Sequence, residues 1–276
     1  MESTDSKSFD IKACKEVIYK MFDESALPSL IEYIKIPNTS RDFDTQYATN
    51  GLLEKAADHV AQWVKSLELK DCTVEIIQHE GYTPIIFTEI KGDLPYTVFY
   101  YGHFDKQPAF TGWSEGLGAT IPVIQEGKLY GRGGADDGYS TYSTMLSIKA
   151  LQLQGIKLPR CVMITEGDEE SGDHIDHYIV ALKDKIGDPG VFMCLDSATC
   201  DYDTFCLTTS LRGVVSCILT VEVTKEGVHS GDASGIVPST FRILRQLLSR
   251  LEDENTGEVN SAFQSPIPPN RYKEIF

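Results

Sequence analysis

The sequence predicts an α/β fold built on a largely parallel sheet. Short apolar runs rich in β-branched residues alternate with longer segments whose apolar residues recur at helical spacing, as in strands joined by crossover helices. In addition, four clusters of acidic or histidine residues lie at the ends of expected strands or in the loops just after them. Ligand-binding residues occupy that position in open α/β sheets.

Each expected element follows from its local pattern. Two amphipathic helices are expected at 10–24 and 46–69, the second because of apolar residues at helical spacing: Leu52, Leu53, Ala56, Val60, Val64 and Leu67. Strands are expected at 73–78, 85–90 and 97–101, followed by a hairpin of 119–124 and 128–130. Next come helix 140–154, which Gly155 is suited to cap, strand 161–165, helix 175–185 and strand 191–195.

The pattern changes near Leu211. A long strand is expected at 214–223, and Ser239 is expected to cap a helix that runs to about Leu251. We therefore expect two domains, 1–210 and 211–276, the second of which starts but does not finish within the sequence.

The charge excludes several classes of partner. The 276 residues include 41 Asp and Glu against 25 Lys and Arg, a net charge of −16. A nucleic-acid binder would need a basic stripe, and attachment to anionic lipid would need basic residues, so neither nucleic acid nor membrane is an expected partner. No apolar run is long enough to span a membrane, and the N-terminus does not resemble a signal peptide. The number of cysteines, seven, is odd, and several lie in apolar runs, which indicates reduced thiols and a cytoplasmic location. They form no C-x-x-C pair, so no structural zinc site is expected.

The four clusters carry the chemistry: His103-Phe104-Asp105, Asp136-Asp137, Glu169-Glu170 and Asp196. Each is weak evidence alone, but together they suit hydrolysis by two metal ions. Imidazole and carboxylate are the usual non-thiol ligands of zinc, and a carboxylate can bridge two ions. One carboxylate must stay outside the metal shell as general base, and an adjacent Glu-Glu pair can divide these roles. By its spacing, Asp105 is suited to orient His103.

These clusters resemble the co-catalytic zinc peptidase family that includes carnosinases and other cytosolic dipeptidases, carboxypeptidase G and aminoacylases. The segments that carry the resemblance are 101–108, 129–137, 166–172, 194–197, 211–213 and 229–231. The resemblance implies a zinc-exopeptidase-like three-layer catalytic domain at 1–210. It also implies that 211–276 is the incomplete start of an α+β lid or dimerisation domain.

The resemblance also implies a role for each site residue. His103 is the implied ligand of one zinc, Glu170 the ligand of the other, Asp136 the carboxylate that bridges both, and Asp196 a further ligand. Glu169 is the implied general base, and Asp105 is the residue that orients His103. His229 is the implied lid histidine, which holds the substrate carbonyl oxygen in the partner's site across a dimer interface. In the family the peptide bond after Asp136 is often cis.

One departure from the family pattern affects the second zinc. Family members are longer, and a returning segment supplies a last histidine ligand, whereas no histidine follows His229 here. We therefore expect this chain alone to bind at most one zinc tightly and to hydrolyse dipeptides negligibly.

The predicted function is that of a dinuclear zinc exopeptidase, with dipeptidase or carboxypeptidase-like activity on small peptides, which forms a homodimer through the lid when complete. Mn²⁺ or Co²⁺ could replace zinc, because such ligands accept them as well. Two alternatives stay open: an N-deacylase of acylated amino acids in the same family, and a truncated, non-catalytic dimerisation module.

Overall fold

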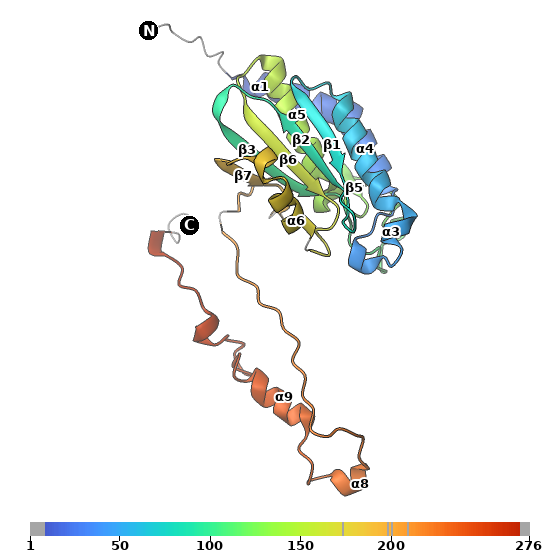
Figure 1. Ribbon diagram of the computed structural model, residues 1–276, viewed down its shortest axis with the longest axis vertical. Helices are drawn as coiled ribbons and strands as arrows, with labels where there is room; N and C mark the ends of the chain where they lie inside the picture. Colours follow the sequence, from blue (N-terminus) through green and yellow to red (C-terminus); the bar gives the residue numbers. More distant parts are fainter. Residues whose placement is uncertain (1–8, 173, 198, 200, 209, 271–276) are drawn as a thin grey trace. The chain divides into compact units, whose positions relative to one another are not determined.

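The computed structural model describes residues 9–172, 174–197, 199, 201–208 and 210–270. The chain divides into two compact units, Met1–Leu207 and Thr208–Phe276 (Figure 1). The first contains the sheet and all of its covering helices, and it is the unit that positions the candidate site.

The first unit is built on a five-stranded sheet. In spatial order its strands are β1 (Cys72–Ile77), β2 (Ile85–Ile90), β6 (Pro159–Glu166), β3 (Leu94–His103) and β7 (Val191–Cys194). β2 runs antiparallel to both of its neighbours, while β3 pairs in parallel with both β6 and β7. Four of the five strands therefore share one direction, and the predicted α/β fold with a mostly parallel sheet is confirmed. A separate hairpin joins β4 (Val123–Gln125) to β5 (Lys128–Tyr130).

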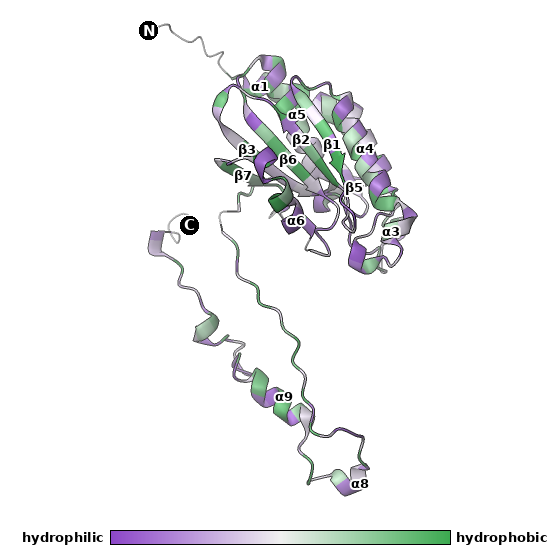
Figure 2. Cartoon of the chain, viewed as in Figure 1, coloured by the Kyte–Doolittle hydropathy of each residue, from purple (hydrophilic) through white to green (hydrophobic). Residues whose placement is uncertain are grey.

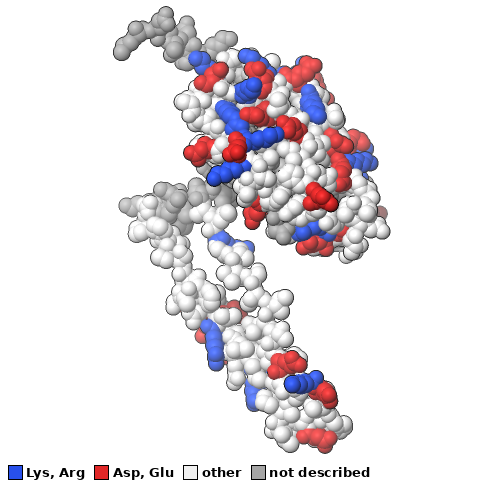
Figure 3. Space-filling model, viewed as in Figure 1, with Lys and Arg blue, Asp and Glu red and all other residues white. Residues whose placement is uncertain are grey.

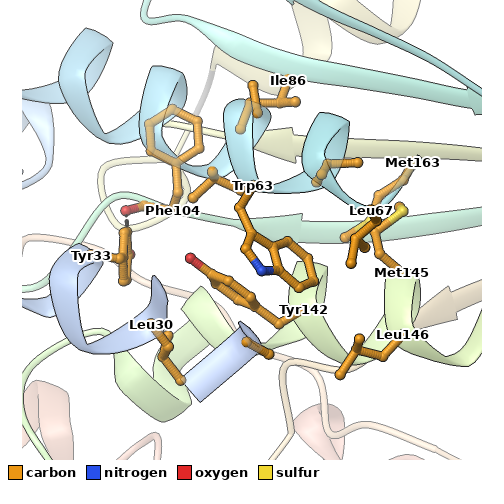
Figure 4. Close-up of a cluster of buried hydrophobic side chains, with 14 of the residues drawn as sticks. Leu30, Tyr33, Trp63, Leu67, Ile86, Phe104, Tyr142, Met145, Leu146 and Met163 are labelled. Carbon is orange, nitrogen blue, oxygen red and sulfur yellow. Dashed lines mark hydrogen bonds between the residues drawn. The ribbon is translucent and has the colours of Figure 1, made fainter. Parts of the chain in front are cut away.

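Both faces of the sheet are covered, because its central strands are apolar on both sides. Along β6, Cys161 and Met163 belong to one buried cluster, whereas Val162 and Ile164 belong to the other. The first cluster lies under α2 (Leu27–Ile34), α4 (Leu52–Ser66) and α5 (Tyr139–Gln154), and Figure 4 shows its side chains. The second lies under α6 (His174–Ala181) and α7 (Lys183–Ile186). The layers are therefore helix, sheet and helix, and the apolar colour of the strands in Figure 2 reflects this double burial.

Local signals explain the helix boundaries. Asp10 caps α1 (Ile11–Met21) by accepting two backbone N–H groups. The helical run then continues through a wide turn, Phe22–Ala26, into α2, so the first helical region is longer than predicted. The predicted helix 46–69 is two helices, α3 (Tyr47–Asn50) and α4. Gly51 separates them at φ 69°, a left-handed conformation that interrupts a helix.

The second unit contains short helices, α8 (Ser230–Ala233) and α9 (Thr240–Leu248), and a 3₁₀ turn, Ser261–Phe263. The Ser239 hydroxyl accepts the N–H of Arg242 and caps α9 as predicted. The strand predicted at 214–223 is wrong. A strand needs a partner, and the described residues of this unit pair only at the isolated bridge between Glu252 and Val259.

The surface agrees with the composition. On the face in view in Figure 3, acidic side chains are interspersed with the basic ones of the first unit. Within the described residues, no helix has the length and apolar character needed to cross a membrane.

The two faces of α5 provide a test of this core. Leu146 is 1% exposed, and Leu153 on the same helix is 60% exposed. We expect Leu146→Ala to lower the free energy of unfolding by about 2–5 kcal/mol, because it removes buried methyl groups and leaves a cavity. The matched control Leu153→Ala should change it by less than about 0.5 kcal/mol. Urea unfolding measured by tryptophan fluorescence would check both, and equal losses would contradict this assignment of the core.

Candidate metal centre

Parallel pairing brings the acidic clusters to one edge of the sheet. His103 is the last residue of β3 and lies opposite Glu166 of β6 in the register, so the Glu169-Glu170 pair follows three residues beyond that edge. Tyr101 lies opposite Cys194, the last residue of β7. Asp196 follows Cys194 by two residues, just as His103 follows Tyr101 by two, so Asp196 lies at the same edge of the sheet as His103. Asp136 lies in the turn Gly134–Gly138, which directly precedes α5.

These side chains converge on one buried imidazole. His103 is 0% exposed, and its Nε2 lies 3.2 Å from Asp136 Oδ1. The same nitrogen lies 3.7 Å from Glu169 Oε2 and 3.7 Å from Asp196 Oδ2. The ligand atoms of two groups lie within 4.8 Å of one another, namely His103, Asp136 and Asp196, and His103, Glu169 and Glu170. The structure therefore assembles His103 with four of the five predicted carboxylates, Asp136, Glu169, Glu170 and Asp196, into one constellation.

Asp105 stabilises the constellation through hydrogen bonds to the backbone of the Glu169-Glu170 pair. Its Oδ1 accepts the N–H of Glu169 and its Oδ2 accepts the N–H of Glu170, both at 3.1 Å. His103 Nδ1 lies 3.2 Å from the Asp105 carbonyl oxygen and 3.4 Å from its carboxylate. Because both of these groups are acceptors, Nδ1 keeps its proton whether or not a metal is bound, so Nε2 is the nitrogen that can exchange a proton for a metal.

The backbone around the site requires small residues. A Cβ on Gly102 would lie 2.3 Å from Ser140 Oγ, so only glycine lets β3 approach the start of α5 this closely. That approach lets Asp137 Oδ2 accept the N–H of His103 at 3.2 Å. The Asp136–Asp137 peptide bond is cis, as the family resemblance implies.

Burial and crowded charges shift the pKa values of the site residues. Burial disfavours a charged imidazole, but hydrogen bonds to Asp105 and Asp136 outweigh it and raise the pKa of His103 to about 12. The hydrogen bond with His103 lowers the pKa of Asp136. Burial raises the pKa of Glu169, Glu170 and Asp196. Without another cation, the imidazolium is therefore the positive charge closest to these carboxylates.

The residues present fit a divalent cation. Glu170 Oε1 is buried, and no N–H or O–H donor among the described residues reaches it. A buried carboxylate oxygen without a donor is unfavourable unless a cation binds it. Imidazole nitrogen with several carboxylate oxygens is also the donor set that zinc and similar ions accept.

Sequence reasoning missed two residues of the loop after β3. Gln107 donates a hydrogen bond to Glu170 Oε2. Lys106 is 2% exposed, and its Nζ donates to the carbonyl oxygens of Tyr33 and Ile36 at 2.9 and 2.7 Å, which ties the end of α2 to the site. Both lie in the segment 101–108 that carries the family resemblance, so the signal was their position within two residues of Asp105 rather than their residue type.

His229 belongs to the second unit, where it caps α8 and its Nδ1 accepts the N–H of Gly231 at 3.2 Å. It is thus the one predicted site residue outside the constellation of the first unit.

Comparisons with known proteins agree with this geometry. The chain is 29% identical over 258 residues to the Cys-Gly metallodipeptidase dug1 of Schizosaccharomyces pombe, an alignment that covers 88% of this chain and 52% of the relative. It is 27% identical to the human Beta-Ala-His dipeptidase over 196 residues, which covers 70% of this chain and 39% of the relative. The chain thus spans about half the length of the dug1 relative and less of the human one.

Solved structures show the same fold. The crystal structure of human carnosine dipeptidase 1 matches with a TM-score of 0.64 at 21% identity, covering 95% of this chain and 57% of that one. The structure of the dipeptidase Dug1p from Saccharomyces cerevisiae matches with a TM-score of 0.63 at 22% identity and the same coverage. Residues 99–260, more than half of the chain, match the sequence model of peptidase family M20/M25/M40, which implies binding of a divalent metal. The chain belongs to peptidase family M20/M25/M40.

Proposed function

We propose that this chain carries the metal centre of a dinuclear zinc exopeptidase that cleaves the amide bond of dipeptides. The observation that supports it most strongly is the convergence on His103 Nε2 of carboxylates from three separate loops. The relatives described above are named for Cys-Gly and Beta-Ala-His, which are dipeptides, and this favours dipeptides over N-acyl amino acids as substrates.

The first group, His103, Asp136 and Asp196, would hold one ion. Glu170, which lies in the second group with His103 and Glu169, would hold the other ion, and Asp136 would be shared between them, as the family resemblance implies. Zinc is the proposed metal, with Mn²⁺ or Co²⁺ as substitutes. When bound, the metal supplies Lewis-acid polarisation of the scissile carbonyl and activation of the attacking water.

Glu169 is the proposed general base. Its side chain is 36% exposed and has no hydrogen bond among the described residues, so it is free to meet a water and a substrate. Burial raises its pKa, which makes it a better proton acceptor than an ordinary carboxylate. Glu169 takes the proton of the attacking water as the new C–O bond forms. It then delivers that proton to the leaving nitrogen as the C–N bond breaks. Asp105 acts by orienting His103 and the Glu169-Glu170 backbone.

Several finer features remain part of the proposal. Residues 1–210 would form the catalytic domain, and 211–276 would begin a lid through which the protein forms a homodimer. His229 would then hold the substrate carbonyl of the partner's site. The proposed location is the cytoplasm.

A panel of dipeptides, dipeptide amides and N-acyl amino acids, assayed with Zn²⁺, Mn²⁺ and Co²⁺, tests the reaction and the substrate class. Faster turnover of N-acyl amino acids than of dipeptides would favour the deacylase alternative.

Glu169→Gln tests the general base. In a full-length protein that contains this chain, we expect dipeptide turnover to fall about 10²–10⁴-fold, because the amide cannot take a proton from water, while the metal content stays unchanged. Steady-state kinetics with metal analysis of the same samples would measure both. The control Glu16→Gln alters an exposed carboxylate on α1 and should leave turnover as it is. Turnover of the Glu169 variant within about tenfold of the unaltered full-length protein would reject this role.

Asp136→Asn and His103→Ala together test the shared ligand. Asp136 is proposed to contact both ions, so its replacement should weaken binding of both, including a weakly bound second ion. His103→Ala should mainly weaken the ion that Asp196 shares. Calorimetric titration of the metal-free chain with zinc would separate the two patterns. Losses confined to the same single ion in both variants would rule out a bridging role for Asp136.

A further inference from the structure

Gln107 is a residue of the metal centre that the proposed reaction does not use. It follows Asp105 by two residues, and its Nε2 donates a hydrogen bond to Glu170 Oε2. Asp105 accepts the backbone N–H of the same Glu170 at 3.1 Å. The loop after β3 therefore holds both the backbone and the side chain of one carboxylate.

This hydrogen bond makes the two oxygens of Glu170 unequal. Oε2 has a donor, whereas Oε1 is buried and has no N–H or O–H donor among the described residues. A buried acceptor without a donor costs free energy in the metal-free site. It is also the state that a metal ligand needs, because the lone pair must be available for the ion. With Oε2 occupied by the amide, Oε1 is the oxygen left to bind it.

The neighbouring Glu169 shows the contrast. Its backbone is held by Asp105 in the same way, at 3.1 Å, but its side chain has no hydrogen bond in the part of the chain that is described. Its Oε2 lies 3.7 Å from His103 Nε2. A carboxylate fixed through one oxygen suits a metal ligand, and an unrestrained carboxylate suits a group that carries a proton between water and the leaving amine.

We propose that Gln107 is a positioning residue that presents Glu170 Oε1 to the metal and so separates the role of Glu170 from that of Glu169. The inference rests on the ligand role of Glu170 in the proposed function, but it requires no turnover by the chain. It can therefore be tested on metal binding alone.

The test is a titration of the metal-free chain with Co²⁺, whose visible absorption reports its coordination geometry, carried to millimolar metal so that weak sites are included. We expect Gln107→Met to weaken the ion bound through Glu170 by about 10–100-fold, the usual loss when a group that holds a metal ligand is removed. The absorption of the ion bound through Asp196 should not change. Gln107→Asn retains the amide but is one methylene shorter, and it should lose as much.

The chain offers a matched control. Gln78 Nε2 donates to Glu54 Oε1 at 2.9 Å, a glutamine–glutamate pair outside the metal centre. Gln78→Met removes the same kind of hydrogen bond there and should bind Co²⁺ as the unaltered chain does. A loss equal to that of Gln107→Met would show a general effect of such replacements and would overturn the proposal.

A double-mutant cycle identifies the ion. Gln107→Met should add little to Glu170→Gln, because both act on the same ligand, whereas it should add fully to Asp196→Asn. Unchanged Co²⁺ affinity in Gln107→Met, equal weakening of both ions, or full additivity with Glu170→Gln would each overturn the inference. So would the absence of any Glu170-dependent Co²⁺ signal. If the expected pattern appears and a full-length protein that contains this chain hydrolyses no dipeptide, the inference stands and the proposed function fails.

Discussion

The carboxylate of Asp105 is the constraint on which the metal centre depends. It is completely buried, and it accepts the backbone N–H groups of Glu169 and Glu170 while facing His103 Nδ1. These contacts join the loop after β3 to the loop after β6. Burying such a charge is unfavourable unless its oxygens have donors, so the position of Asp105 and the conformation of both loops depend on each other.

The sheet and its covering helices in turn hold the loop of Asp105. The N–H of Phe104 donates to the carbonyl oxygen of Glu166 at 2.8 Å, which extends the parallel pairing of β3 with β6 by one residue. The Phe104 carbonyl oxygen accepts the Tyr33 hydroxyl and the Asn38 side-chain amide, both at 2.6 Å. Figure 4 shows Tyr33 and Phe104 in contact within the buried cluster. The proposed ligand His103 is therefore followed directly by a residue of the core, and such rigid support is what a metal site requires.

Sequence reasoning succeeded where a local pattern decides the outcome. The apolar runs located all five strands of the main sheet, including β1 and β7, which contain no buried residue, and Gly155 ends α5 as predicted, at φ 70°. It failed at 214–223, where the residues have strand-like composition but no partner among the described residues of their unit. Composition reports the preference of a segment, whereas strand formation depends on another segment that composition does not specify.

The same distinction applies to the site. The clusters could be found because histidine and carboxylates directly after strands are unusual, and parallel strands bring such residues to one edge. The roles of Gln107 and Lys106 could not be found, because a glutamine or lysine in a loop is ordinary until the structure shows what it contacts. Gln107 contacts Glu170, 63 positions along the chain, and Lys106 contacts Ile36, 70 positions away.

The charge of the site connects its geometry to its stability. Five carboxylates lie around one imidazole: Asp105, Asp136, Glu169, Glu170 and Asp196. Burial disfavours the charged imidazole, but its contacts with Asp105 and Asp136 raise its pKa to about 12. A proton on His103 offsets part of their repulsion, but it occupies Nε2, the nitrogen that a metal would bind. Metal and proton therefore compete for the same atom, and binding a divalent ion releases that proton while it adds more positive charge. Because an unfolded chain does not preassemble these ligands, an ion that binds them favours the folded state in proportion to the logarithm of its concentration over its dissociation constant. The sheet edge is thus the part of the first unit where folding and metal binding are most closely linked.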